Sequence, residues 1–139
     1  MAQDAPYKLA YQLITDIISQ QDVLVSVNSG AGSVAEARIE KELPFRIRDK
    51  WATLGEESRS WHIHVNMEEV VEARFVKEPR SGAKQSYSIR FYDSHGNLAL
   101  RANFIKMYDS SGNLLKEKAA QFEKLYIKYG SKDSLSLRG

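Results

Sequence analysis

The spacing of apolar residues changes twice along the chain, and this limits the folds that it can adopt. Residues 9–18 repeat apolar side chains every three or four positions, which is typical of a helix, here over about residues 5–20. From residue 23 onward, apolar and polar side chains alternate, as in strands that bury one face. A helical spacing returns over residues 115–129 and ends at Gly130. The sequence therefore predicts a helix, about seven strands and a second helix.

The expected strands are short and follow one another closely. Residues 51–54 fit neither spacing clearly, and residues 67–71 are predicted to form one helical turn. Connections of hairpin length favour antiparallel pairing. We therefore expect an α+β fold in which an antiparallel β-sheet platform is flanked by N- and C-terminal helices. The predicted strands are 23–27, 34–41, 45–48, 61–65, 72–78, 84–92 and 98–106.

One stretch of the chain is nearly repeated. IRFYDSHGNL (89–98) recurs as IKMYDSSGNL (105–114), sixteen residues later. In both, an aspartate precedes a glycine that can adopt a positive φ, which is the pattern of a tight turn. We interpret the repeat as two similar turns rather than as a repeat architecture. The first turn carries His95, a predicted solvated residue, and Asn113 in the second is predicted to cap the following helix.

Length and charge are those of an ordinary globular domain. A chain of 139 residues suits a single domain, which we expect to span residues 1–130. Residues 131–139 offer little to bury and are predicted to form a mobile tail. The net charge of +2 is too small to indicate a nucleic-acid surface.

The sequence also predicts where the protein works. Residues 1–21 carry an early acidic residue, Asp4, and no basic start, unlike a signal peptide. No apolar run approaches the roughly 18 residues of a membrane span. Because cysteine is also absent, we expect a cytoplasmic protein with no membrane span.

Histidine is the main carrier of candidate chemistry. The lack of cysteine excludes thiolate catalysis, disulfide bonds and thiolate metal ligands. His62 and His64 are two positions apart on a predicted strand and should project from the same face. Such a pair is compatible with ordinary surface histidines, with an axial ligand to haem iron, or with another metal ion. A zinc ion would need further ligands, and the nearest acidic residues in sequence are Glu68, Glu69 and Glu72.

Arginines on predicted strands offer a second kind of chemistry. Arg46, Arg48 and Lys50 alternate along one segment, which indicates either a solvated strand face or a site for an anion such as a carboxylate. Arg74, Arg90 and Arg101 allow the same two interpretations. No catalytic motif is present, and no acid–base pair stands out beyond the two histidines. These features favour a binding protein, with a small-molecule enzyme as the weaker alternative, and we assign no catalytic residue.

Residues 61–98 resemble the repeat unit of the HemS/ChuX haem-utilisation proteins. Ile63-His64-Val65 falls on the family's Leu-His-Leu element, within WHIHVNMEEVVEARFVKEP (61–79). Within SYSIRFYDSHGNL (86–98), the turn approximates the family's Phe-Asp-x-x-Gly element. The residues that match the remaining motif positions are Val76, Lys77 and Pro79, for Val-Arg/Lys-x-Pro, and Phe91, Asp93 and Gly96, for the turn.

The resemblance implies a fold and a function. Members of the family have an antiparallel sheet flanked by helices and bind haem in the cytoplasm for storage, delivery or, in some tandem members, breakdown. Larger members hold two units, whereas ChuX-like members are single units that dimerise. This chain has the length of one unit, so the resemblance implies a homodimer whose partner is haem. His64 is the expected axial ligand to the haem iron, with His62 as the alternate, and Arg46, Arg48 and Arg101 are expected to pair with the haem propionates.

The sequence also departs from the family. Tandem members carry an Ile-His-Ser-Gly-Pro-like segment before the tryptophan strand, but residues 37–44 contain no histidine. Arg74 stands where the family often has tryptophan. Haem binding remains the leading prediction, and the missing histidine motivates an alternative, a dimeric structural or regulatory module that keeps the scaffold and has lost haem binding.

Overall fold

The N-terminal helix forms where the apolar spacing predicts it. The computed structural model describes residues 5–39, 42–56, 58 and 60–138. A 3-10 turn, η1 (Ala5–Tyr7), leads into α1 (Lys8–Ile18). One face of α1 is fully buried, because its apolar side chains recur at helical spacing. The buried residues of α1 are Ala10, Leu13, Ile14 and Ile17.

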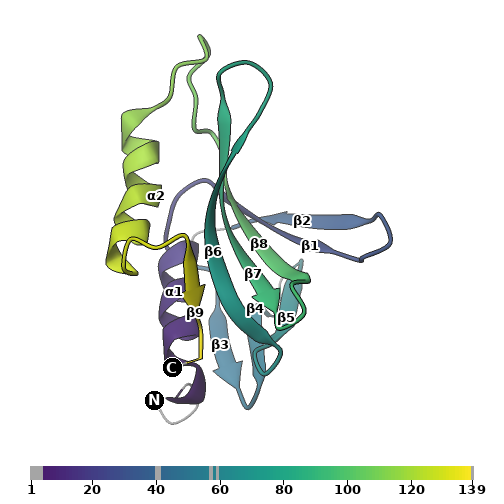
Figure 1. Cartoon of the computed structure of the whole chain (residues 1–139). Coiled ribbons are helices and arrows are strands. Elements are labelled where there is room, and N and C mark those ends of the chain that lie inside the picture. The colour runs from purple at the N-terminus through teal and green to yellow at the C-terminus, as the bar shows by residue number, and fades with distance from the viewer. Residues whose placement is uncertain (1–4, 40–41, 57, 59, 139) are drawn as a thin grey trace.

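Nine strands form two antiparallel sheets in the described part of the chain (Figure 1). A six-stranded sheet has the order β2-β1-β8-β7-β6-β9, and a three-stranded sheet has the order β3-β4-β5. The predicted α+β fold with an antiparallel sheet is therefore confirmed. The bounds are β1 (Val23–Asn28), β2 (Val34–Arg38), β3 (Phe45–Arg48), β4 (Trp51–Gly55), β5 (His62–Asn66), β6 (Val70–Pro79), β7 (Gln85–Asp93), β8 (Leu98–Phe104) and β9 (Ser134–Ser136).

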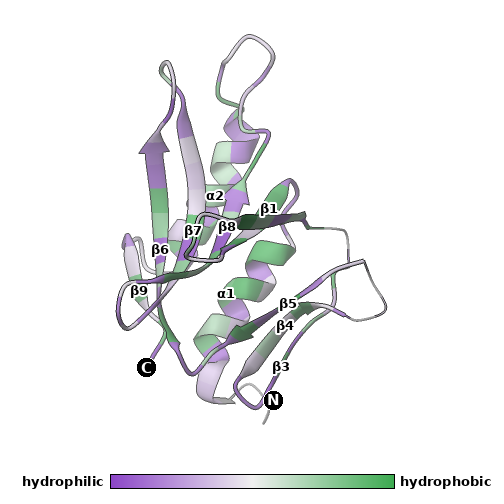
Figure 2. Cartoon of the chain, turned by 90° about the vertical axis from the view of Figure 1, so that its right-hand side faces the viewer, coloured by the Kyte–Doolittle hydropathy of each residue, from purple (hydrophilic) through white to green (hydrophobic). Residues whose placement is uncertain are grey.

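The second helix, α2 (Lys116–Lys128), covers one face of the six-stranded sheet. Its Phe122 is 1% exposed and packs edge to face against Phe75, Tyr87 and Phe104, with ring centroids 5.3–5.8 Å apart. Both helices lie on the same side of this sheet in Figure 1, and Figure 2 shows them behind it. The opposite face is therefore left open by the helices.

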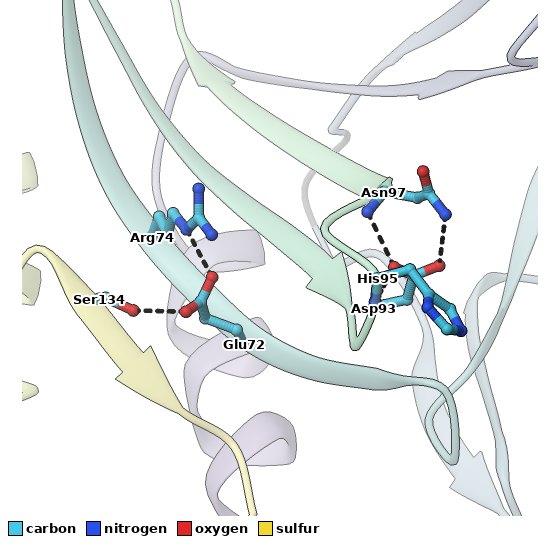
Figure 3. Close-up of polar contacts among 6 residues, drawn as sticks. All are labelled: Glu72, Arg74, Asp93, His95, Asn97 and Ser134. Carbon is cyan, nitrogen blue, oxygen red and sulfur yellow. Dashed lines mark hydrogen bonds and ion pairs between the residues drawn. The ribbon is translucent and has the colours of Figure 1, made fainter.

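The near-repeat in the sequence encodes two turns of the same geometry. In the β7–β8 turn, the Asp93 carboxylate accepts the backbone N–H groups of His95 and Asn97 at 2.9 and 2.8 Å (Figure 3). These bonds favour the ionised carboxylate and lower the pKa of Asp93. Asp109 accepts the N–H groups of Ser111 and Asn113 in the same way. The interpretation as two similar turns is confirmed.

Three local predictions are corrected by the structure. Residues 67–69 form a turn, and Val70 already begins β6, so no helical turn forms there. Asn113 belongs to the Asp109 turn, and the residue at the N-terminus of α2 is Leu115, without a side-chain cap. The strand predicted over residues 34–41 ends at Arg38, and residues 40–41 lie outside the described residues.

The C-terminal segment packs more closely than its composition predicts. β9 pairs with β6, and the Glu72 carboxylate accepts the Ser134 hydroxyl at 2.8 Å (Figure 3). Leu137 is 4% exposed, and the Arg138 guanidinium donates to the Met67 carbonyl at 2.7 Å. The expectation that residues 131–139 have little to bury is therefore wrong. It failed because pairing with β6 supplies a partner that the segment's own composition cannot reveal.

Asp22 follows α1 in sequence, and its side chain pairs with a lysine of α2. Ionisation of the Asp22 carboxylate should therefore stabilise the fold. Lys118 donates a hydrogen bond to its carboxylate and Lys106 lies 3.6 Å away, which together lower the pKa of Asp22. A lowered folded-state pKa means that this contribution is complete above the ordinary aspartate pKa of about 3.9. It is then lost as the pH falls through the folded-state pKa.

We expect Asp22→Asn to lower the free energy of unfolding by about 1 kcal/mol at pH 7 and to have a smaller effect at about pH 3, below the ordinary aspartate pKa. Urea unfolding at both pH values measures the difference. Glu36→Gln, on the exposed edge strand β2, serves as the control and should change little at either pH. An equal loss in Asp22→Asn at both pH values would contradict the ionic explanation.

Candidate functional site

The outer face of the three-stranded sheet gathers four of the predicted site residues. The strands alternate, so Ala52, Leu54 and Val65 point into the core and their neighbours point outward. In register, Arg46 lies opposite Thr53, which lies opposite His64, while Arg48 lies opposite Trp51. We call this surface the His-Arg face; it comprises Arg46, Arg48, Trp51, Thr53, His62 and His64.

A shallow cavity of about 460 Å³ opens on the His-Arg face. Its volume falls within the usual range for small-molecule sites. Trp51 is 44% exposed, although tryptophan is a large apolar side chain. It meets the His64 ring edge to face, with centroids 6.5 Å apart. The cavity is lined by Arg46, Arg48, Asp49, Trp51, Thr53 and His64, so three predicted residues from two strands meet at one site.

The His64 ring is oriented by a buried hydroxyl. Thr53 Oγ1 lies 2.9 Å from His64 Nδ1, and Thr53 is only 4% exposed. When Nδ1–H donates to this oxygen, the lone pair of Nε2 is left free on an exposed ring. An outer partner of this kind orients the ring of a metal-binding histidine. The arrangement therefore suits His64 to ligate a metal centre through Nε2.

A second cavity lies on the other side of His64, next to the β7–β8 turn. Its volume is about 160 Å³, and Asn66, Glu69, Asp93 and Asn97 line it together with His64. The described residues contain no group of three histidine or acidic side chains close enough to hold a metal ion. Glu68, Glu69 and Glu72 therefore do not complete a zinc site with the histidines.

Arg101 lies in the other sheet. It is on β8, where Leu100, Ala102 and Phe104 are buried and Arg101 projects from the opposite face. It is a direct cross-strand neighbour of Arg90, which in turn neighbours Arg74 on β6. Arg101 is not among the residues that line the cavity on the His-Arg face.

The three arginines that lie side by side on β6, β7 and β8 differ in how they pair with acidic side chains. Arg74 pairs with Glu72 at 2.5 Å (Figure 3) and lies 4.3 Å from the Tyr92 ring centre. Arg90 pairs with Glu78 at 2.9 Å. That ion pair lowers the pKa of Glu78. By contrast, Arg101 Nε is buried and has no hydrogen-bond partner among the described residues.

We expect Arg101→Met to raise the free energy of unfolding by about 1 kcal/mol, because loss of the unpaired buried donor and of the repulsion from Arg90 outweighs loss of the weaker attraction between Arg101 and the Glu78 carboxylate. Chemical denaturation measures this change. Arg38→Met, at an exposed position of β2, is the control and should change stability little. A loss of stability in Arg101→Met would mean that this guanidinium is satisfied in solution.

The site also contains three residues that the sequence did not predict there: Asp49, Trp51 and Thr53. Residues 51–54 fitted neither spacing, so the pairing of β4 with β3 and β5 could not be assigned from the sequence. The signal that could have found Thr53 is its position two residues from Trp51, since both must then share a strand face. His95, as predicted, is exposed at the turn.

The fold of this chain is shared with known proteins. A protein-family model matches residues 11–130, which is most of the chain. No match was found among curated protein sequences. No helix built from the described residues has the length and apolar character to cross a membrane.

Solved structures with the same fold include haem-binding proteins. ChuX has a TM-score of 0.70 at 18% identity, with 88% of this chain and 73% of ChuX covered. A protein from Agrobacterium tumefaciens has a TM-score of 0.69 at 18% identity, with coverages of 88% and 68%. PhuS, a haem-binding protein from Pseudomonas aeruginosa, has a TM-score of 0.62 at 14% identity, with coverages of 84% and 32%. Together with the match over residues 11–130, these likenesses show that the chain belongs to the HemS/ChuX-like family.

Proposed function

We propose that the protein binds haem on the His-Arg face and serves in haem trafficking or storage in the cytoplasm. The observation that carries the proposal is the His64 ring, which Thr53 holds at the edge of a cavity that also contains two arginines. ChuX and PhuS, which share the fold, are described as haem-binding proteins.

The residues of the His-Arg face fit the chemistry of haem. His64 offers Nε2 to the iron, and the guanidinium groups of Arg46 and Arg48 match propionate carboxylates. Trp51 offers an exposed aromatic surface for a flat macrocycle. Haem itself would supply the iron centre; the protein would bind and orient it, with Thr53 holding the His64 ring in place. We assign no part in haem contact to Arg101, because it does not line this cavity.

Haem titration followed by the Soret absorbance tests the proposal. The wild-type protein should show a shift that saturates near one haem per chain. Arg46→Gln with Arg48→Gln should weaken binding about tenfold, since both charge-assisted partners of the propionates are lost. Arg38→Gln, on exposed β2, is the matched control. Absence of a saturable shift at micromolar haem would contradict the proposal and favour the alternative, a scaffold that has lost haem.

We further propose that the protein acts as a homodimer. Neither helix covers the other face of the six-stranded sheet (Figure 2). Light scattering should give twice the chain mass of 15.8 kDa at roughly 100 μM, where an obligate dimer persists. A mass of one chain would contradict the dimer.

A further inference from the structure

We propose that His62 and His64 together chelate a divalent first-row transition-metal ion, Cu²⁺ most tightly, on the solvent side of β5. This site does not depend on haem binding. Competition between the ion and haem for His64 does rest on the function proposed above, because one imidazole nitrogen cannot ligate both.

The two rings are already in contact. His62 and His64 are separated by one residue on β5, so strand alternation projects them from the same face. Their ring centroids are 5.0 Å apart, with an angle of 65° between the planes. Both residues are exposed. Two imidazoles at this separation can each place a nitrogen on one ion with little side-chain movement.

The ring nitrogens are available for an ion. His64 Nδ1 is engaged by Thr53, which leaves Nε2 as the free ligand atom. Gly55, the cross-strand neighbour of His62, carries no side chain beside its ring. A Cβ at Gly55 would lie 2.6 Å from the Trp61 carbonyl oxygen, so the backbone keeps this position free of a side chain.

The donor set selects the kind of ion. Imidazole suits Cu²⁺, Ni²⁺ and Zn²⁺, and affinities follow the order that places Cu²⁺ highest. No third histidine or acidic ligand is in place among the described residues, so solvent must complete the coordination. Arg46 and Arg48 on the same face repel a cation, and Asp49 in their cavity and Glu69 and Asp93 in the cavity beside His64 offset part of this repulsion. We therefore expect an exchangeable site rather than a structural one.

Titration of the haem-free protein with Cu²⁺, followed by calorimetry and electron paramagnetic resonance, tests this site. Wild type should bind one Cu²⁺ per chain with a nitrogen-coordinated signal. His62→Ala should weaken binding by about tenfold or more, and so should His64→Ala. His95→Ala, which removes an exposed histidine from the β7–β8 turn, is the matched control and should leave binding unchanged. The double variant His62→Ala, His64→Ala measures binding elsewhere on the chain, and circular dichroism confirms that each variant is folded.

Haem binding by the same variants distinguishes the metal-site proposal from the haem-binding proposal. His62→Ala should retain haem while losing Cu²⁺, and bound haem should suppress Cu²⁺ binding in the wild-type protein. Unchanged Cu²⁺ affinity in His62→Ala, or wild-type binding no tighter than in the double variant, would overturn the metal site whatever the haem result. If haem does not bind at all, the Cu²⁺ result still decides the metal site by itself.

Discussion

Replacement of Phe122 by alanine is expected to lower the free energy of unfolding by about 3–5 kcal/mol. This ring is the point at which α2 meets the six-stranded sheet, because it contacts aromatic side chains from three strands. It is 1% exposed, so truncation removes apolar burial and leaves a cavity that neighbouring rings cannot fill without moving. Such a loss is a large fraction of the stability of a domain this size.

Urea unfolding followed by circular dichroism measures this loss. Ile127→Ala is the matched control, since it lies on the same helix but is 65% exposed. Its effect should stay within about 0.5 kcal/mol. A change below about 1 kcal/mol in Phe122→Ala would mean that α2 does not anchor the sheet in solution.

Replacement of His64 by alanine is expected to have the largest effect on haem binding. Outer partners of metal ligands alone typically contribute about 10–100-fold in affinity, so removal of the ligand itself should cost at least that much. The change also leaves Thr53, 4% exposed, without its imidazole partner, but creates no cavity in the core. Stability should therefore fall far less than haem affinity.

Haem titration and urea unfolding of the same His64→Ala preparation separate these effects. His95→Ala is the control, because its imidazole is exposed and lies outside the His-Arg face. Undiminished haem affinity in His64→Ala would remove this residue from the site. A matching loss in His95→Ala would also count against the assignment.

The fold was predictable because each long element carries a clear local period. The buried stripe of α1 and the alternation of β7 and β8 are plain in the sequence, and both formed as expected. β9 was not predicted, because three residues have too little pattern of their own and form a strand only by pairing with β6. The turn at residues 67–69 is closed by N–H groups that donate to Asn66, which the apolar spacing of residues 67–71 does not reveal. At the start of α2, the Leu115 N–H donates to the Met107 carbonyl, a contact that helix-capping patterns do not predict.

The candidate site was predictable as residue types but not as an arrangement. Strand alternation placed His62 with His64 and Arg46 with Arg48, whereas their meeting depends on the register of β3, β4 and β5. The same lack of register information grouped Arg101 with these residues, although it belongs to β8 in the other sheet. Thr53 was missed because its role comes from one cross-strand hydrogen bond.

Imidazole rescue of the haem complex tests the central claim most directly, because it asks whether His64 supplies the nitrogen that ligates the iron. The absorption and electron paramagnetic resonance spectra of haem-loaded wild type, His62→Ala, His64→Ala and His95→Ala are compared before and after addition of free imidazole. We predict that the spectrum changes in His64→Ala alone and returns to the wild-type form when imidazole is added. An unchanged spectrum in His64→Ala, or a change in His62→Ala in its place, would contradict the claim.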